Sequence, residues 1–209
     1  MYDKASCSNR RVVPMDYVPP REDFFRSPAT ELAPALIGCL LKKESSGGPV
    51  SGVIVETEAY TRDDPASHSY GGMTARNRTM FQGGGLAYVY MIYGVHNCFN
   101  VTSGLPGTGQ AVLVRAVRPV QGIDIMLANR GLRDIRRLCR GPGMLCQAFG
   151  MDRSLNGTSL IVGDVRILVP RVPVEHDISC GMRVGISRGR EMMRRYFLND
   201  SEWVSRIRV

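Results

Sequence analysis

Val55-Glu56-Thr57-Glu58-Ala59-Tyr60 ends a stretch rich in β-branched residues, and Val50 to Tyr60 is predicted to form a β-strand. Side chains alternate between the two faces of a strand, so Glu56, Glu58 and Tyr60 share one face. Two carboxylates on an otherwise apolar strand are costly to bury unless they are solvated or paired. This face is therefore either exposed, with solvated glutamates, or it carries a general base that activates a water. The spacing alone does not say which glutamate would serve.

A histidine, basic residues and an aromatic run follow this strand. His68 lies in a polar loop, Arg76-Asn77-Arg78 comes next, and Tyr88-Val89-Tyr90-Met91-Ile92-Tyr93-Gly94 follows. The pattern predicts two strands, Leu86–Ile92 and Asn97–Thr102, which form a hairpin-like pair around Tyr93-Gly94. Carboxylates, one histidine and several tyrosines this close together indicate a pocket for a flat base.

Tyr93 is expected near the tip of this pair, where a large aromatic side chain exposes apolar surface without gaining from burial. It either folds back onto the sheet or inserts as a wedge between base steps, as proteins that bind the minor groove of DNA do. In the second case, Tyr60, Tyr90 and His68 would stack on an extruded base.

Arg115 is the second unusual charge, because it lies in the middle of the apolar strand Ala111–Val117. An arginine in that position is expected to be partly buried and to need a carboxylate partner. Glu56 or Glu58 would serve. A structural ion pair and an active-site pair are equally consistent with the strand alone.

Length and composition narrow the class of protein. The 209 residues suit one large domain or two small ones, and 44% of them are hydrophobic, enough for an ordinary core. Neither a window apolar enough to cross a membrane nor a secretory signal is visible, so an intracellular protein is expected. Six cysteines without a CxxC pair are expected to be reduced. Three widely spaced histidines predict no metal site.

The charge balance is basic, with a formal net charge of +8. Of the 27 basic residues, three are lysines and 24 are arginines. Arginine binds phosphate bidentately and stacks on bases, so the balance indicates a polyanionic partner. Replacement of lysine by arginine in a GC-rich genome is the alternative explanation.

The remaining patterns predict short helices and strands without repeats or a linker, so we expect one mixed α+β domain. Residues 1 to about 23 are expected to form a mobile tail. A helix is predicted to start near Thr30 and to place Leu32, Leu36, Ile37, Leu40 and Leu41 on one face. Further predictions are helices at Gly122–Asn129 and Met144–Phe149, a strand at Ile161–Val169, an end of the Ala111–Val117 strand at Pro119, and a strand pattern over Val184–Arg208.

Together these residues resemble the alkyladenine (3-methyladenine) DNA glycosylase family over roughly residues 24 to 205. Each motif is short, but the ordered set is specific. The matching pieces are Val55-Glu56-Thr57-Glu58-Ala59-Tyr60, His68-Ser69, Gly71-Gly72, Arg76-Asn77-Arg78, Met80-Phe81, Tyr88 to Gly94, Asn100, Leu113-Val114-Arg115-Ala116, Gly141-Pro142, Leu145-Cys146-Gln147-Ala148 and Arg183-Val184-Gly185.

The resemblance implies a fold and a set of roles. The fold is a single compact α+β domain, here residues 24 to 209, with a curved antiparallel sheet, flanking helices and a protruding β-hairpin that inserts into DNA. Glu58 corresponds to the general base. Arg115 and the backbone carbonyl of Val184 correspond to the groups that complete the water site.

Other positions correspond to groups that contact DNA. Tyr60, His68 and Tyr90 match the side chains around the flipped base, and Asn100 matches the pocket asparagine that helps to discriminate against guanine. Tyr93 matches the intercalating tyrosine of the hairpin. We also predict backbone contacts for three arginines, Arg76, Arg78 and Arg188.

The implied enzyme is a monomeric, monofunctional glycosylase of base-excision repair that acts on double-stranded DNA containing damaged purines. It needs no cofactor or metal and does not contact membranes. Its compartment would be the cytoplasm or nucleoid in a bacterium and the nucleus in a eukaryote. The loop from Tyr60 to His68 and the segment before Gly141-Pro142 are shorter than in vertebrate members, which bears on the lesions accepted.

Three alternatives are open at this stage. One is a nucleic-acid-binding module without catalysis, and another is a hydrolase of RNA or free nucleosides. The third is a bifunctional glycosylase–lyase, which needs an amine nucleophile. Lys4, Lys42 and Lys43 are the only lysines and lie outside the matched site motifs.

Overall fold

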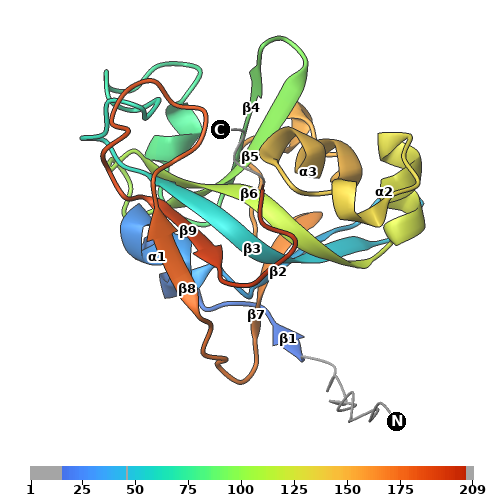
Figure 1. Cartoon of the computed structure of the whole chain (residues 1–209). Helices are drawn as coiled ribbons and strands as arrows, with labels where there is room; N and C mark the ends of the chain where they lie inside the picture. Colours follow the sequence, from blue (N-terminus) through green and yellow to red (C-terminus); the bar gives the residue numbers. More distant parts are fainter. Residues whose placement is uncertain (1–15, 46, 206–209) are drawn as a thin grey trace, which may run out of the picture.

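The strand predicted from Val50 to Tyr60 is confirmed as β3, with those bounds. The computed structural model describes residues 16–45 and 47–205, and β3 runs through the middle of its sheet (Figure 1). Along one edge β3 pairs with β6 (Gln110–Gln121). Along the other edge it pairs first with β2 (Leu40–Lys43) and then with β9 (Arg195–Leu198). The two glutamates of β3 therefore have a strand on both sides.

The sheet has the strand order β1-β7-β2-β3-β6-β5-β4, and every pairing in it is antiparallel. The outer strands are β1 (Tyr17–Val18), β7 (Val165–Pro170), β5 (His96–Ser103) and β4 (Ala87–Ile92). β8 (Ile178–Gly181) pairs with β9, again antiparallel. Within the described residues, three α-helices accompany this sheet. The predicted single α+β domain is thus confirmed.

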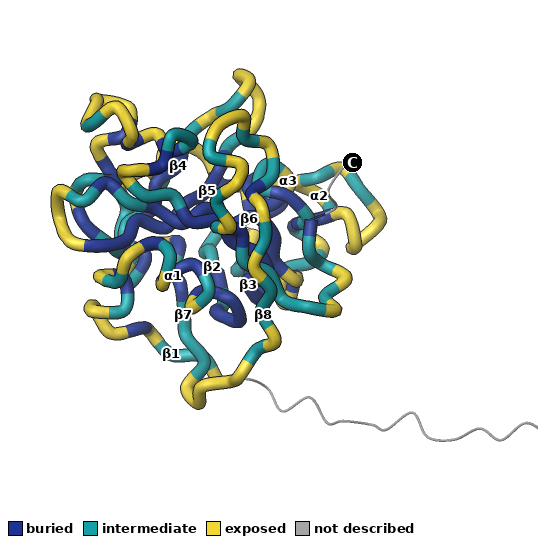
Figure 2. The backbone as a smooth tube through the Cα atoms, turned by 60° about the vertical axis from the view of Figure 1, so that its left-hand side comes forward, coloured by how far each residue is buried: buried dark blue, intermediate teal, exposed yellow. Residues whose placement is uncertain are grey.

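The helices cover the sheet and close the core. α1 (Ala29–Ala35) packs on β3, and α3 (Pro142–Phe149) packs on β5 and β6 beside α2 (Ile123–Arg130). Four short 3₁₀ helices are η1 (Glu22–Arg26), η2 (Arg78–Phe81), η3 (Ile135–Arg137) and η4 (Arg153–Leu155). Figure 2 shows the buried residues concentrated in the sheet and in the helix segments that face it.

The helix predicted from Thr30 across Leu41 is shorter than expected, because α1 ends at Ala35. Gly38 has a φ of +87° and donates its N–H to the Ile54 carbonyl, which turns the chain into β2. Leu40 and Leu41 therefore belong to a strand. Helical spacing was misleading here because apolar residues of two short elements bury against the same core.

The predicted strand end at Pro119 is also wrong, since β6 continues to Gln121. The Val117 N–H donates to the Cys139 carbonyl, on the side away from β3. Two residues later, the nitrogen of Pro119 points to that same side, where β6 has no strand partner beyond Leu113. A proline removes no ladder hydrogen bond in such a position.

Two other strand predictions are wrong in their bounds. β7 starts at Val165 rather than Ile161, because Gly163 donates its N–H to the Ser159 carbonyl and forms a turn. Within the described part of 184–208, only β9 is a strand, and residues 206–208 lie outside the description. The helix predictions near 122–129 and 144–149 are confirmed as α2 and α3.

Residues 1–15 of the predicted tail lie outside the described residues. Tyr17 and Val18 form β1 and pair with Pro170 and Val169. The tail boundary at residue 23 stays a prediction.

All cysteines of the described residues are free. Cys180 is exposed, and the buried ones are Cys39, Cys98, Cys139 and Cys146. No described helix combines the length and apolar character that crossing a membrane requires.

β4 and β5 pair from Ala87↔Val101 to Ile92↔His96, close to the bounds predicted from the sequence. Their far end stands clear of the sheet (Figure 1). Tyr93 and Gly94 in the connecting turn have φ values of 50° and 70°. The Tyr93 side chain is 86% exposed, so the alternative in which it folds back onto the sheet is wrong.

Candidate active site

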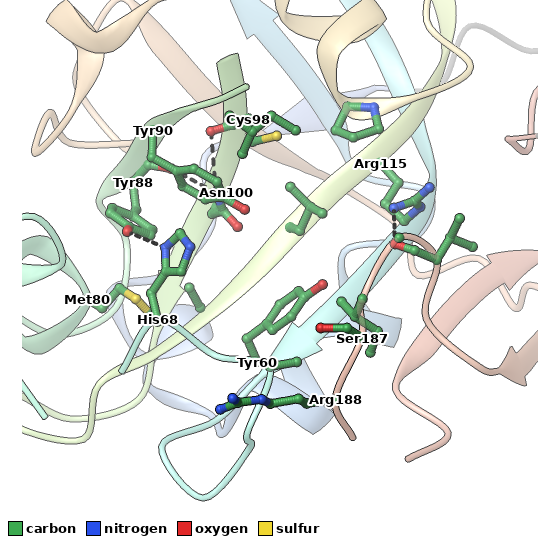
Figure 3. Close-up of a pocket in the computed structure, with 18 of the residues that line it drawn as sticks. Tyr60, His68, Met80, Tyr88, Tyr90, Cys98, Asn100, Arg115, Ser187 and Arg188 are labelled. Carbon is green, nitrogen blue, oxygen red and sulfur yellow. Dashed lines mark hydrogen bonds between the residues drawn. The ribbon is translucent and has the colours of Figure 1, made fainter. Parts of the chain in front are cut away.

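A cavity of about 540 Å³ lies beside the β4–β5 pair and above the end of β3. The side chains of His68, Tyr88 and Tyr90 lie together on one side of it, and Arg115 lies on the other (Figure 3). Its lining comes from β3 to β6, the β4–β5 turn, the start of α3 and the segments that follow β3 and β8. It includes Tyr60, Pro65, Ala66, His68, Met80, Tyr88, Tyr90, Ile92, Tyr93, Cys98, Asn100, Leu113, Arg115, Pro142, Val184, Ile186, Ser187 and Arg188.

A local irregularity between β3 and β6 positions Arg115. The register shifts on both sides of Glu56, so Glu56 pairs with Ala116 and Thr57 pairs with Val114. Arg115 therefore has no opposite residue in the register, as at a β-bulge. Its Nε lies 3.1 Å from Glu56 Oε1, and its Nη1 lies 3.3 Å from Glu58 Oε1. One guanidinium thus contacts both carboxylates.

Glu58 is completely buried, which rules out the exposed-face interpretation. Its Oε1 accepts the N–H of Val184 at 2.8 Å and also contacts Arg115. Its Oε2 accepts the hydroxyl of Tyr60 at 2.8 Å. Val184, Arg115 and Tyr60 all line the cavity. A carboxylate oxygen has two lone-pair sites, so Oε2 keeps one for a further donor.

Glu56 has a different environment, although it lies on the same strand. Its Oε1 accepts from Arg115 Nε at 3.1 Å, from Arg195 Nε at 2.7 Å and from Ser205 Oγ at 2.8 Å. Its Oε2 accepts from the Ser205 N–H at 2.7 Å. Neither glutamate lines the cavity itself, but all three partners of Glu58 do, whereas Arg115 is the only one of these Glu56 partners that does. Glu56 thus mainly holds three chain segments together. The structure thus separates the two glutamates, which the sequence spacing did not.

The charge on Arg115 is secured by its two partners. Burial lowers the pKa of the guanidinium, but the charges of Glu58 and Glu56 outweigh burial and raise that pKa above its ordinary value. Its Nη1 also donates to the Val184 carbonyl at 3.5 Å. Arg115 is therefore a fixed cation between the buried glutamates and the cavity.

His68 forms one aromatic wall together with two tyrosines. Its Nδ1 is hydrogen-bonded to the Tyr88 hydroxyl at 2.8 Å, and its ring centroid lies 4.4 Å from that of Tyr90. Burial, assisted by the charge of Arg76, lowers the pKa of His68 below 6.5, so the ring is neutral at pH 7. Burial also raises the pKa of Tyr88 to about 12.

Tyr60 is held from behind by a buried ion pair. The guanidinium of Arg183 lies 4.7 Å from the centre of the Tyr60 ring, and it is paired with Asp64. Arg183 also donates to the carbonyls of Ala59 and Gly189. Burial, followed by the charge of Glu58, raises the pKa of Tyr60 well above its usual value. Tyr60 therefore stays protonated and able to donate to Glu58.

Asn100 presents a single free polar atom to the cavity. Its Nδ2 donates to the carbonyls of Tyr88, at 3.0 Å, and Cys98, at 3.4 Å. Both amide hydrogens are therefore occupied, and Oδ1 is the atom left for a bound group.

The structure brings most of the predicted site residues together. Tyr60, His68, Tyr90, Tyr93, Asn100, Arg115, Val184 and Arg188 line one cavity, and Glu58 lies directly beneath it. Arg76 lies behind Tyr90, with its guanidinium 5.9 Å from the ring centre, and Arg78 is exposed at the start of η2. Neither lines the cavity. The functional roles of all these residues stay predictions.

The sequence analysis missed two supporting residues. Tyr88 had a usable signal, because it alternates with Tyr90 on the same face of β4. Asp64 had none, because an aspartate next to other charged residues in a polar loop is usually solvated. In the part of the chain that is described, no group of three or more His, Cys, Asp or Glu side chains is arranged to hold a metal ion.

The fold and site define a class of protein: a basic α+β chain with an aromatic cavity and a buried, ion-paired carboxylate beneath it. The family model described as "Methylpurine-DNA glycosylase (MPG)" matches residues 23–202. The chain therefore belongs to the methylpurine-DNA glycosylase family. It is a DNA glycosylase of base-excision repair, a hydrolase that acts on N-glycosyl bonds, and DNA is its substrate.

Relatives from archaea and bacteria match over nearly the whole chain. A protein of Methanoculleus marisnigri is 47% identical over 88% of this chain and 96% of its own length. One of Carboxydothermus hydrogenoformans is 43% identical, with coverages of 90% and 98%. One of Rhodopseudomonas palustris is 46% identical, with 90% of both chains covered. Each has the name "Putative 3-methyladenine DNA glycosylase".

Proposed function

We propose that this glycosylase extrudes alkylated or deaminated purines from duplex DNA and cleaves the N-glycosidic bond with a water activated by Glu58, leaving an abasic site. The observation that carries the proposal is the position of Glu58, buried under an aromatic cavity and bonded to three groups that line it. The names of the relatives support 3-methyladenine as a substrate. We extend the proposal to 7-methylguanine, hypoxanthine and ethenoadenine, and to action as an intracellular monomer.

Stacking in the cavity would select the damaged base. Extrusion costs a few kcal/mol and costs least for a damaged or mispaired base. 3-Methyladenine in DNA carries a positive charge, and a cation is attracted to the faces of electron-rich rings such as Tyr60 and Tyr90. His68 is neutral at pH 7 and adds no repulsion. The cavity thus offers a cationic purine contact with several rings.

Hydrolysis would use the free lone pair of Glu58. Oε2 takes a proton from a water, whose oxygen forms a bond to the sugar C1′ while the bond from C1′ to the base nitrogen breaks. The electron pair of that bond leaves with the purine and neutralises its positive charge. The ionised carboxylate also stabilises positive charge that develops on the sugar. Arg115 forms an ion pair with Glu58 at 3.3 Å, and we assign the Val184 carbonyl to the same water site.

The proposal is tested by incubating the protein with duplexes that contain 3-methyladenine, 7-methylguanine, hypoxanthine or ethenoadenine. We expect free base to be released and the strand at the abasic site to stay intact, with no adduct trapped by borohydride. The position of the lysines supports the absence of an adduct, because they lie far from Glu58 in the described chain. Lys42 of β2 pairs with Ser51 of β3. Ser51 lies about 23 Å from Glu58 along the strand, at roughly 3.3 Å per residue. No base release, or a trapped adduct, would contradict the proposal.

Tyr93 is expected to act as the wedge that fills the vacated stack. Tyr93→Ala should weaken binding and excision on fully paired lesion duplexes, and the loss should shrink when the lesion is mispaired, because the wedge compensates unstacking. The melting temperature should hardly change, since the side chain is 86% exposed.

Val95 in the same turn is 72% exposed and provides the matched control, Val95→Ala. Arg188→Ala should instead weaken binding to all duplexes alike and reduce the salt dependence. An equal loss for Tyr93→Ala on every substrate, or a large drop in its melting temperature, would show that Tyr93 is not a wedge.

A further inference from the structure

A second groove, of about 800 Å³, lies on the other side of β4 from the base cavity. Val89 and Met91 line this groove, while Tyr88 and Ile92, which alternate with them, line the base cavity. Tyr90 borders both. The other lining residues are Ala75, Arg76, Arg153, Ser154 and Asn156. The β4–β5 pair therefore has the base cavity on one face of β4 and this β4 groove on the other.

The β4 groove is built against the edge of the sheet. β4 is the last strand of the sheet on this side. The Val89 N–H donates to Asn156 Oδ1 at 3.1 Å, and the Met91 carbonyl accepts from Arg76 Nη2 at 3.4 Å. Side chains of two distant segments thus cap the backbone groups of β4. This edge is closed to strand pairing, and the two arginines are held close to the β4–β5 pair.

The charge of the β4 groove is positive and uncompensated. Arg76 and Arg153 are both exposed, the lining contains no carboxylate, and neither arginine has an ion-pair partner within residues 16–45 and 47–205. Asp152 precedes Arg153, but its Oδ1 accepts from the N–H and hydroxyl of Ser154. Arg171, which is also exposed, differs in this respect because it is paired with Asp16.

We propose that the β4 groove binds the phosphodiester backbone of the DNA that flanks the lesion, with Arg153 and Arg76 as the cationic groups. Guanidinium groups match phosphate oxygens in geometry and charge. The placement rests on the proposed function: with a base in the cavity and Tyr93 at the tip, the duplex crosses the end of the β4–β5 pair. Its flank on the β4 side then lies over this groove. Phosphate contacts of this kind fix the position of the protein on DNA without reading sequence.

Salt dependence on undamaged duplex is the first test, because it does not require catalysis. Replacing one phosphate contact should flatten the plot of log association constant against log salt by about 0.9. We expect this change for Arg153→Ala and no change for Arg171→Ala, at the opposite edge of the sheet. An unchanged slope in Arg153→Ala would overturn the proposal.

The second test locates the phosphate. Duplexes that each carry one neutral methylphosphonate are scanned around an abasic-site analogue, with binding measured for wild type and Arg153→Ala. At one or two positions on one side of the analogue, the substitution should weaken wild type but not the variant. Equal losses for both proteins at every position would overturn the proposal. Binding to these duplexes is measurable even if the assigned excision chemistry is wrong, so the two failures are distinguishable.

Discussion

Glu58→Gln should lower the single-turnover rate of base excision by about 10²–10⁴-fold, the range typical for loss of a general base. Binding to a lesion duplex should stay close to wild type. Glutamine keeps the shape of the side chain and can still accept the Val184 N–H that Glu58 accepts at 2.8 Å. It cannot take a proton from water, nor can it stabilise positive charge on the sugar.

The measurement is excision from a 3-methyladenine duplex with protein in excess, together with a melting temperature. The fold should be retained, because Arg115 keeps Glu56 as a partner at 3.1 Å. Tyr60→Phe is a useful companion, since it removes the donor to Oε2 but leaves the ring for stacking. It should lose less activity than Glu58→Gln. Excision by Glu58→Gln near the wild-type rate would remove Glu58 as the base.

The sequence was sufficient for the parts of the site that single strands determine. The bounds of β3, the need of Arg115 for a carboxylate partner and the position of Tyr93 in a turn follow from alternation of side chains and from the cost of an unpaired buried charge. These rules act locally, so a single segment contains the information they need.

Other features depend on segments that are far apart in the sequence, and they were not predictable. Glu56 and Glu58 have the same local pattern, and only the approach of Ser205 and Arg195 distinguishes them. The pair of Asp64 and Arg183 joins two loops that are far apart in the sequence, and neither loop indicates the partner of its charge. The error over α1 and β2 has the same origin, because Leu41 buries in the core without continuing the helix.

Glu56→Gln should act mainly on stability, in contrast to the same change two residues later. Its carboxylate accepts from Arg115, Arg195, the Ser205 N–H and the Ser205 hydroxyl, and it is fully buried. Removing one partner of a buried ion pair typically costs about 3–5 kcal/mol, because the other charge stays buried without compensation. Arg195 is 4% exposed and has no other carboxylate partner within the described residues.

We therefore expect the free energy of unfolding of Glu56→Gln, measured by urea denaturation, to fall by roughly 3 kcal/mol. Excision per folded molecule should fall less than in Glu58→Gln. Glu44→Gln is the matched control: Glu44 also contacts two cations, Lys42 and Arg166, but at the surface, and its loss should change stability little. If Glu56→Gln were as stable as the control and as inactive as Glu58→Gln, the assignment of a structural role to Glu56 and a catalytic role to Glu58 would be wrong. Glu56 would then belong to the chemistry, and Arg115 would be shared between two catalytic carboxylates.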